Sequence, residues 1–289
     1  MSALFSPLRL RDVTFRNRVF VSPMCQYSSD DGFPGSWHLV HLGSRAVGGA
    51  ALVLQEATAV DPAGRISPAD AGIWSLEHAR AYAPIAAFIK AQGAIPGVQL
   101  AHAGRKASSD APWRGGRPLG PEAGGWTPVA PSAIPFDAGW PTPRALDADG
   151  IDAVVESFVA AARSARSAGF EVVELHMAHG YLLHEFLSPL SNRRGDRWGG
   201  DFAGRSRLPL RVARAVRDSW PAELPLFVRL SVTDWIEGGW DLAQSIELAR
   251  RLRDAGVDLV DCSSGGAVPG ASVPVAPGYQ VPFAAALRR

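Results

Sequence analysis

The sequence predicts an α/β protein whose parallel strands close into a barrel. Two observations carry this prediction: six short apolar runs have the length and composition of buried strands, and a helical segment follows each of them. Regular alternation of strand and helix is typical of a parallel sheet. Because the units repeat with this spacing, we expect the helices on one side of the sheet, which favours a barrel over a doubly wound sheet.

The first three units occupy the N-terminal part of the chain. We expect strands at residues 19–22, 51–55 and 95–100, with helices at 39–48, 77–92 and 151–168. Gly169 is a natural stop for the third helix, because glycine adopts the left-handed conformation that ends many helices. That helix has an apolar stripe with helical spacing, formed by Ile151, Val154, Val155, Phe158, Val159 and Ala162.

The last three units have strands at residues 171–175, 226–230 and 257–262. Their helices span residues 203–220 and 241–255, and a sixth helix includes residues 284–289. Asp241 and Gln244 have the spacing of a capping box, and Gly256 ends that helix. Because an eightfold barrel needs two more strand–helix units, we expect residues 1–289 to form a single, incomplete barrel domain with unpaired strand edges.

Composition and charge exclude several classes of protein. The 289 residues are 47% hydrophobic and 20% charged, which is ordinary for a globular domain, and the formal net charge is +1. A charge this small creates no field that would draw the protein to nucleic acid or to an acidic membrane. No apolar run approaches the roughly 20 residues of a transmembrane helix, and the N-terminus lacks the features of a signal peptide. With only Cys25 and Cys262, we expect no disulfide framework and a cytoplasmic protein with reduced thiols.

The connection from about residue 104 to residue 149 is unusually long. It is rich in glycine, proline and tryptophan, and it contains Trp113, Trp126 and Trp140. Loops longer than about 15 residues in a compact domain are usually functional or disordered. We expect this segment to fold as a cap over the mouth of the barrel.

Two imidazoles and a phenol follow the expected strand at residues 171–175. They belong to His176, His179 and Tyr181, and in an α/β barrel the carboxyl ends of the strands form the catalytic face. Such a group suits a substrate that must be polarised and then protonated. The residues alone leave other interpretations open: the H-x-x-H spacing also suits a metal, the histidines could be a buried structural pair, and Tyr181 could pack over the barrel rim.

Other polar residues lie where further strands end. A buried cation such as Arg229 needs a partner, and Glu174 or Asp234 could supply an ion pair. The amide of Gln99 could bind a ligand or satisfy the barrel backbone. Glu56, Glu174 and Asp234 also fit the paired carboxylates of a glycosidase, but that interpretation leaves the arginine, the amide and the histidine–tyrosine group unexplained.

Several separated motifs resemble the Old Yellow Enzyme family, in the branch that has a cysteine near the flavin. The resemblance covers residue 5 to about residue 279. It rests on NRV (17–19), SPMCQY (22–27), EATAV (56–60), QLAHAGRK (99–106), HMAHGY (176–181), EFLSP (185–189), NRR (192–194), the glycines at 199–200 and VRLS (228–231). The resemblance implies a (β/α)8 TIM barrel that binds FMN without a covalent link. It also implies reduction of activated C=C bonds, with NADPH rather than NADH favoured as the electron source.

The resemblance further implies roles for individual residues. His176 and His179 resemble the pair that binds the carbonyl or nitro oxygen of the substrate. Tyr181 resembles the proton donor to the α-carbon, while hydride comes from N5 of reduced FMN. Tyr27 resembles a residue that adds another hydrogen bond to the substrate, and the role of Lys106 is open. The residues implied to contact the flavin are Ser22, Pro23, Met24, Cys25, Ala57, Gln99 and Arg229.

Within the flavin set, three residues have a specific implied place. Arg229 would lie at the N1 and O2 edge and stabilise the anionic reduced ring, and Gln99 would contact the pyrimidine edge. Cys25 would lie by the C4 carbonyl and tune its redox behaviour, although a buried inert thiol is a common alternative.

The expected incomplete barrel leaves two functions open. In the family that these motifs resemble, the FMN phosphate lies at the loops after strands seven and eight, which we expect to be missing from the six units of this sequence. The chain is therefore either an ene-reductase whose barrel is completed elsewhere, or a flavin-poor, non-catalytic barrel fragment or assembly partner. For the enzyme we expect a small activated alkene as substrate and no nucleic-acid or membrane partner, with a homo-oligomer left open.

Overall fold

A sheet of six parallel strands forms the centre of the computed structural model, which describes residues 2–289. The strand order is β10-β9-β8-β5-β4-β3. All five pairings are parallel, so the predicted parallel α/β architecture is confirmed. The strands are β3 (Phe20–Val21), β4 (Leu52–Ala59), β5 (Ile95–Ala101), β8 (Val172–Met177), β9 (Leu226–Ser231) and β10 (Leu259–Ser263).

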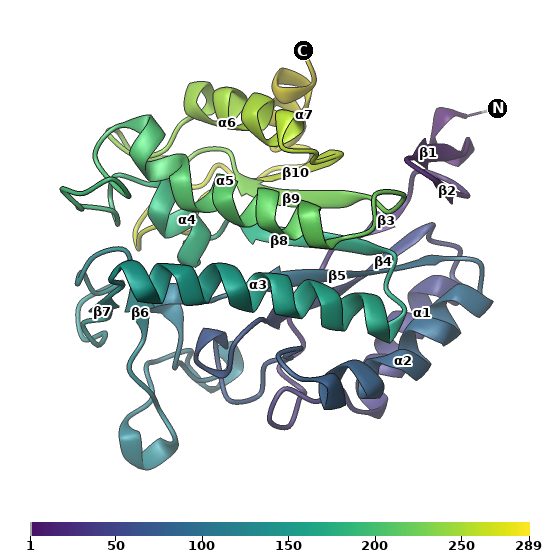
Figure 1. Ribbon diagram of the computed structural model, residues 1–289, viewed down its shortest axis with the longest axis horizontal. Coiled ribbons are helices and arrows are strands. Elements are labelled where there is room, and N and C mark those ends of the chain that lie inside the picture. The colour runs from purple at the N-terminus through teal and green to yellow at the C-terminus, as the bar shows by residue number, and fades with distance from the viewer. Residues whose placement is uncertain (1) are drawn as a thin grey trace.

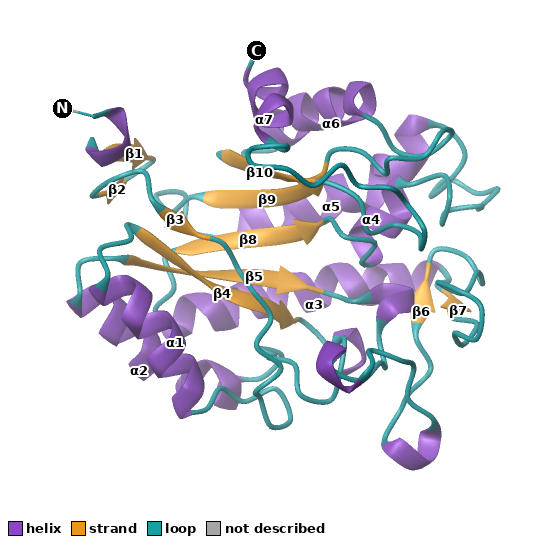
Figure 2. Cartoon of the chain, turned by 180° about the vertical axis from the view of Figure 1, so that it is seen from behind, coloured by secondary structure: helices purple, strands orange, loops and turns teal. Residues whose placement is uncertain are grey.

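The long helices lie on one side of this sheet, as predicted. Figure 2 shows helices behind the middle of the sheet and along both of its sides, and Figure 1 shows the same arrangement from the opposite direction. Helices adjacent in sequence along this layer pack against one another. They are α1 (Ser36–Val47), α2 (Leu76–Ala91), α3 (Ala148–Ala168), α5 (Phe202–Ser219) and α6 (Leu242–Asp254). The sheet is therefore a half-barrel whose helices cover its outer face.

Short elements that the sequence analysis did not predict complete the fold. Strands β1 (Leu8–Leu10) and β2 (Val13–Phe15) form an antiparallel hairpin. The ring of Phe15 is fully buried against Phe20 and Phe227 of the sheet. Helix α4 (Leu182–Leu187) follows β8. By contrast, the sixth helix was predicted and is present as α7 (Val281–Arg288), which packs on α6 and β10. None of the helices described in residues 2–289 is long and apolar enough to cross a membrane.

Several predicted boundaries need correction. Strand β4 runs four residues further than expected, to Ala59, with a register shift between Gln55 and Ala57 that keeps it paired with β5. Strand β10 begins two residues later than expected, because the Asp258 side chain is taken up by Arg11 and by the Leu226 backbone N–H.

The predicted helix ends are largely confirmed. Gly169 ends α3 in the left-handed conformation, with φ of 94°. The capping box at Asp241 is only half formed, since Asp241 accepts from the Gln244 N–H but the Gln244 side chain turns to Arg205 and Gly239 instead.

The long connection before α3 is built from turns rather than from regular structure. It contains three short 3-10 turns and a parallel pair of two-residue strands, β6 (Val129–Ala130) and β7 (Arg144–Ala145). Trp113 packs edge-on against Tyr27, and Trp126 Nε1 donates to the Ala63 carbonyl. Trp140 lies apart from them, against Phe136. The first two tryptophans thus bind this segment to the carboxyl-end loops, as expected of a cap, whereas the third does not.

The inner face of the sheet carries a buried carboxyl group next to a cavity of about 400 Å³. Glu174 is fully buried, and its Oε1 accepts from Gln99 Nε2 at 2.8 Å, while Oε2 has no hydrogen-bond partner among the described residues. Burial, with repulsion from Asp261, raises the pKa of Glu174 to about 8, although Arg229 opposes the shift. The cavity is lined by Phe20, Ser22, Leu54, Glu174, Phe227, Leu259, Asp261 and Gln280, among others.

We predict that Glu174→Gln removes a pH-dependent loss of stability. A carboxyl whose pKa is raised on folding binds its proton more tightly in the folded chain, so its contribution falls as pH rises from about 4.5 to 8. Glutamine keeps an oxygen for Gln99 but has no proton to lose. The difference in unfolding free energy, variant minus wild type, should therefore increase by at least about 2 kcal/mol from pH 5 to pH 8, since one pKa unit corresponds to about 1.4 kcal/mol.

Urea unfolding at each pH measures this difference. The surface variant Glu156→Gln on α3 is the matched control for loss of an exposed carboxylate. A difference between Glu174→Gln and wild type that stays constant with pH would show that Glu174 is ionised in the folded protein.

Candidate active site

Strand register places the predicted site residues on neighbouring strands at the carboxyl half of the sheet. Gln99 on β5 pairs with Ala57 on β4 and with Glu174 on β8. Two residues nearer the carboxyl end of β8, His176 pairs with Arg229 on β9, which in turn pairs with Asp261 on β10. The structure thus brings together side chains from strands that are far apart in the sequence.

His176, His179 and Tyr181 form one cluster where β8 ends. The ring of His176 lies edge-on to both neighbours, with its centroid 5.0 Å from that of His179 and 4.9 Å from that of Tyr181. His176 is 3% exposed. The three side chains therefore face one another, as their spacing predicted.

Hydrogen bonds define the tautomer of each imidazole. The Ala178 N–H donates to His176 Nδ1 at 3.2 Å, so the His176 proton is on Nε2, 3.3 Å from His179 Nδ1. The His179 proton is then on its Nε2, which lies 2.7 Å from Ser263 Oγ. Both imidazoles are consistent with a single arrangement in which each is neutral and presents one N–H.

Burial keeps this cluster uncharged at neutral pH. Desolvation, reinforced by nearby cations such as Arg229 and Lys106, lowers the pKa of His176 well below its usual value and that of His179 to about 3. Desolvation likewise raises the pKa of the Tyr181 phenol well above its usual value, and Cys25 and Tyr27 add to that shift. The site therefore offers two neutral N–H donors and a phenol that keeps its proton.

The backbone turn that carries these residues is tightly packed. His179 has a φ of +59°, an unusual conformation for a side chain other than glycine, and Gly180 follows at +73°. A Cβ at Gly180 would lie 2.0 Å from the Gly266 carbonyl oxygen, so only glycine fits there. Strained non-glycine residues of this kind concentrate at functional sites, where the surrounding structure enforces them.

Lys106 lies against the same turn. Its Nζ donates to the His179 carbonyl at 2.9 Å and stands 5.2 Å from the centre of the Tyr181 ring. Desolvation lowers the pKa of Lys106 to about 8. A role in this turn accounts for the lysine that the sequence motif singled out without explaining.

The loop after β3 brings the predicted cysteine to the site. Cys25 is half-buried, and burial raises the pKa of its thiol, so it is a neutral S–H group beside the Ala57 backbone. Tyr27 is half-buried and has a φ of +49°, the second strained site residue. Of the other predicted residues, Pro23 is buried, whereas Ser22 and Met24 are exposed. Pro23 and Met24 have apolar side chains, and the Ser22 hydroxyl makes no hydrogen bond within residues 2–289.

Glu56 and His38 hold this loop in place. Glu56 Oε2 accepts from the Gln26 N–H at 2.6 Å, and its Oε1 lies 3.1 Å from His38 Nε2. His38 Nδ1 accepts from the Gly35 N–H at 3.0 Å. A buried carboxylate and a buried imidazole thus fix the backbone between Cys25 and Tyr27.

The polar groups under the cluster fit the edge of a flavin ring. Arg229 lies 3.3 Å from Asp261 through Nε, so its ion pair is with Asp261 and not with Glu174 or Asp234. Its Nε is buried and lacks a hydrogen-bond partner among residues 2–289, and neither terminal nitrogen has one there. Gln99 gives its amide N–H to Glu174 and keeps its carbonyl oxygen. A guanidinium with free donors next to an amide acceptor suits the pyrimidine edge of FMN, which both donates and accepts.

The carboxylates considered for a glycosidase are engaged elsewhere. Glu56 binds the loop after β3, Glu174 binds Gln99, and Asp234 accepts from Ser188 and from the Trp240 N–H. Three or more His, Cys, Asp or Glu side chains arranged as a metal site do not occur in the part of the chain that the structure describes.

Sequence reasoning missed Ser263, His38 and His184. Ser263 could have been found, because it ends a barrel strand in the run Cys262-Ser263-Ser264, and polar residues at that position belong to the catalytic face. His38 and His184 lie inside helices, where nothing in the local pattern separates them from core residues.

Comparison with known proteins agrees with this geometry. The model of the NADH:flavin oxidoreductase / NADH oxidase family matches residues 3–281. The NADPH dehydrogenase of a Geobacillus species is 46% identical over 288 residues, which cover 99% of this chain and 79% of that protein. The NADPH dehydrogenase of Bacillus velezensis is 45% identical over 287 residues, which cover 99% of this chain and 80% of that protein.

Solved structures show the same relationship. Morphinone reductase superposes with a TM-score of 0.81 at 29% identity, covering 99% of this chain and 78% of that one. The Old Yellow Enzyme homologue from Zymomonas mobilis gives a TM-score of 0.78 at 30% identity, covering 90% of this chain and 73% of that one. The chain therefore belongs to the NADH:flavin oxidoreductase / NADH oxidase family, that of the Old Yellow Enzymes, and is an oxidoreductase that uses FMN and a nicotinamide nucleotide.

Proposed function

We propose that the protein reduces C=C bonds conjugated to a carbonyl or nitro group, with NADPH as the electron source. The observation that carries this proposal is the cluster of two neutral imidazoles and a protonated phenol beside an arginine with free donors. The NADPH dehydrogenases among its relatives support the choice of nucleotide.

His176 and His179 bind the substrate oxygen. An oxygen placed between the rings accepts their N–H groups in place of the contacts to His179 Nδ1 and Ser263 Oγ. Negative charge grows on that oxygen when the β-carbon is reduced, and fixed donors in a dry site stabilise it without reorganisation. Bound FMN supplies the hydride that makes this reduction possible.

Tyr181 supplies the proton to the α-carbon. Its phenol remains protonated at neutral pH, because burial raises its pKa, and its ring contacts that of His176. A proton donor aimed at the carbon next to the polarised group completes the addition. Tyr27, which lies near the same ring, adds a hydrogen bond to the bound substrate.

Residues under the cluster hold and tune the flavin. Arg229 stabilises negative charge at the N1 and O2 edge, and Gln99 binds the pyrimidine side. Cys25 offers a neutral S–H near the C4 carbonyl. The remaining contacts to the ring come from Ser22, Pro23, Met24 and Ala57.

We also propose that residues 1–289 form one domain that represents six units of a (β/α)8 barrel. Six parallel strands in sequential order, with β3 and β10 at the edges, support this interpretation. The alternative of a flavin-poor, non-catalytic fragment or assembly partner is not favoured, because the family match spans residues 3–281 and includes every proposed site residue.

Tyr181→Phe should slow alkene reduction by about 10²-fold or more, the usual cost of losing a general acid. Reduction of the flavin by NADPH should be nearly unchanged, because that step needs no proton from the phenol. Stopped-flow absorbance of the flavin separates the two half-reactions. Tyr82→Phe, which loses a fully buried phenol bonded to Gln55, is the matched control. Equal slowing of both half-reactions by Tyr181→Phe would contradict the proton-donor role.

Replacing both His176 and His179 by alanine should weaken binding of 4-hydroxybenzaldehyde by at least about tenfold. Its phenolate mimics the charged oxygen of the reduced substrate, and each lost hydrogen bond is worth about 0.5–1.5 kcal/mol. Titration of the flavin absorbance measures the dissociation constant. His41→Ala, a buried histidine on α1, controls for loss of an imidazole elsewhere. Unchanged affinity in the double variant would remove the pair from the site.

A further inference from the structure

Side chains from three elements hold the backbone of the turn between His179 and Tyr181. The His179 N–H donates to Ser231 Oγ at 2.9 Å, and the His179 carbonyl accepts from Lys106. The Gly180 N–H donates to Nδ1 of His184, on α4, at 2.9 Å. Because His184 is fully buried, no water can replace this acceptor without opening the turn.

The contact with Gly180 defines the tautomer of His184. A nitrogen that accepts an N–H carries no proton of its own, so the His184 proton is on Nε2. That nitrogen lies 3.0 Å from Asp234 Oδ1 in a bent contact, and neither atom has an aligned hydrogen bond within residues 2–289. A carboxylate oxygen accepts but cannot donate, so Asp234 favours the tautomer that Gly180 requires.

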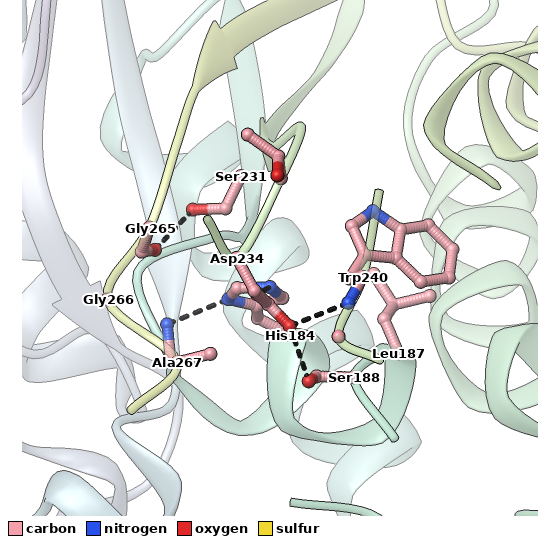
Figure 3. Close-up of polar contacts among 12 residues, drawn as sticks. His184, Leu187, Ser188, Ser231, Asp234, Trp240, Gly265, Gly266 and Ala267 are labelled. Atoms are coloured by element: carbon pink, nitrogen blue, oxygen red, sulfur yellow. Dashed lines mark hydrogen bonds and ion pairs between the residues drawn. The ribbon is translucent and has the colours of Figure 1, made fainter. Parts of the chain in front are cut away.

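Asp234 is itself rigidly held. Its Oδ2 accepts from Ser188 Oγ at 2.6 Å and from the Trp240 N–H at 2.8 Å, and Figure 3 shows it between these two groups and His184. Although burial raises the pKa of Asp234, the adjacent His184 imidazole and the hydrogen bonds from Ser188 and Trp240 lower it below its usual range. The group facing Nε2 is therefore an ionised carboxylate.

We infer that Asp234 and His184 are positioning residues that fix the His179–Tyr181 turn by selecting the imidazole tautomer that accepts the Gly180 N–H. The inference rests on the proposed role of His179 and Tyr181 for its catalytic consequence, but not for its structural one. Neither Asp234 nor His184 contacts the proposed substrate site. Both act through the backbone that carries His179 and Tyr181.

Asp234→Asn tests the tautomer with almost no change of shape. The asparagine oxygen can keep the hydrogen bonds from Ser188 and Trp240, which places its NH2 group against His184 Nε2. The imidazole then has to accept there and carry its proton on Nδ1. Two donors would face each other across the 2.9 Å between Nδ1 and Gly180 N, and the turn loses its anchor. The same change from aspartate to asparagine beside a catalytic histidine selects the wrong tautomer in serine proteases.

His184→Asn supplies the complementary variant. Its amide oxygen occupies the place of Nδ1 and accepts the Gly180 N–H, and an amide cannot exchange donor and acceptor by moving a proton. In the His184→Asn background, Asp234→Asn should therefore no longer matter to the turn. A merely structural role for Asp234 would make it matter equally in both backgrounds.

The experiment compares four FMN-loaded proteins: wild type, Asp234→Asn, His184→Asn and the double variant. Nitrogen-15 NMR of the imidazoles should find the wild-type proton on Nε2 and the Asp234→Asn proton on Nδ1. Asp234→Asn should also speed hydrogen exchange of the Gly180 amide and weaken 4-hydroxybenzaldehyde binding about tenfold, the effect of one misplaced hydrogen bond. In the His184→Asn background both effects should disappear.

A proton on Nδ1 of wild-type His184 would overturn the inference without any variant. So would equal effects of Asp234→Asn in the two backgrounds, or unchanged Gly180 exchange. Ser245→Ala removes the buried acceptor of the Trp240 Nε1–H and the donor to the Val232 carbonyl. This variant controls for lower stability and should leave the tautomer unchanged. If the wild type binds no phenol, the proposed function fails, while the NMR and exchange measurements still test the positioning role.

Discussion

Desolvation of the polar side chains at the end of strand β8 is the constraint on which the site depends. His176 and His179 are close enough for their rings to exchange a hydrogen bond, yet Arg229 and Lys106 both lie near them. In water, imidazoles can bind a proton at mildly acidic pH. Here a charged imidazole would add a third positive charge to a desolvated region, so both rings stay neutral. The same desolvation keeps the proton on Tyr181. One physical cause therefore gives the site both its donors and its acid.

The fold supports this desolvated cluster through the backbone. Two strained residues, Tyr27 and His179, present side chains from the loops after β3 and β8. A buried imidazole paired with a buried carboxylate stands behind each loop, His38 with Glu56 and His184 with Asp234. In each pair the imidazole Nδ1 accepts a glycine N–H, from Gly35 and Gly180. Strain at the site is thus balanced by polar groups that have no contact with the substrate themselves.

Much of the fold follows from local pattern. The strands β5, β8 and β9 are buried on both faces, so each is a predominantly apolar run that the sequence alone reveals. Gly169 likewise marks the end of α3, because glycine readily adopts the left-handed conformation found there. The N-terminal hairpin was not predicted because the burial of Phe15 depends in part on Phe227, which is more than two hundred residues away in the sequence. The start of strand β10 was predicted two residues too early, because the Asp258 side chain binds Arg11, which is distant in the sequence.

The same distinction holds for the site. His176, His179 and Tyr181 lie together because they follow one strand, so their spacing predicted the cluster. The partner of Arg229 could not be read from spacing, since Glu174, Asp234 and Asp261 all lie near strand ends and only the register selects Asp261. The roles of Ser263 and His184 depend on hydrogen bonds that form only in the folded protein, so the residues around each one in the sequence do not reveal them.

Nitrogen-15 chemical shifts of His176 and His179 in the FMN-loaded protein, followed from pH 8 to pH 5, test the central claim most directly. Neutral rings with the proton on Nε2 across that whole range are the expected result. Rings that take up a second proton near pH 6.5, as exposed imidazoles do, would show that water reaches the cluster and that its chemistry is not the one described.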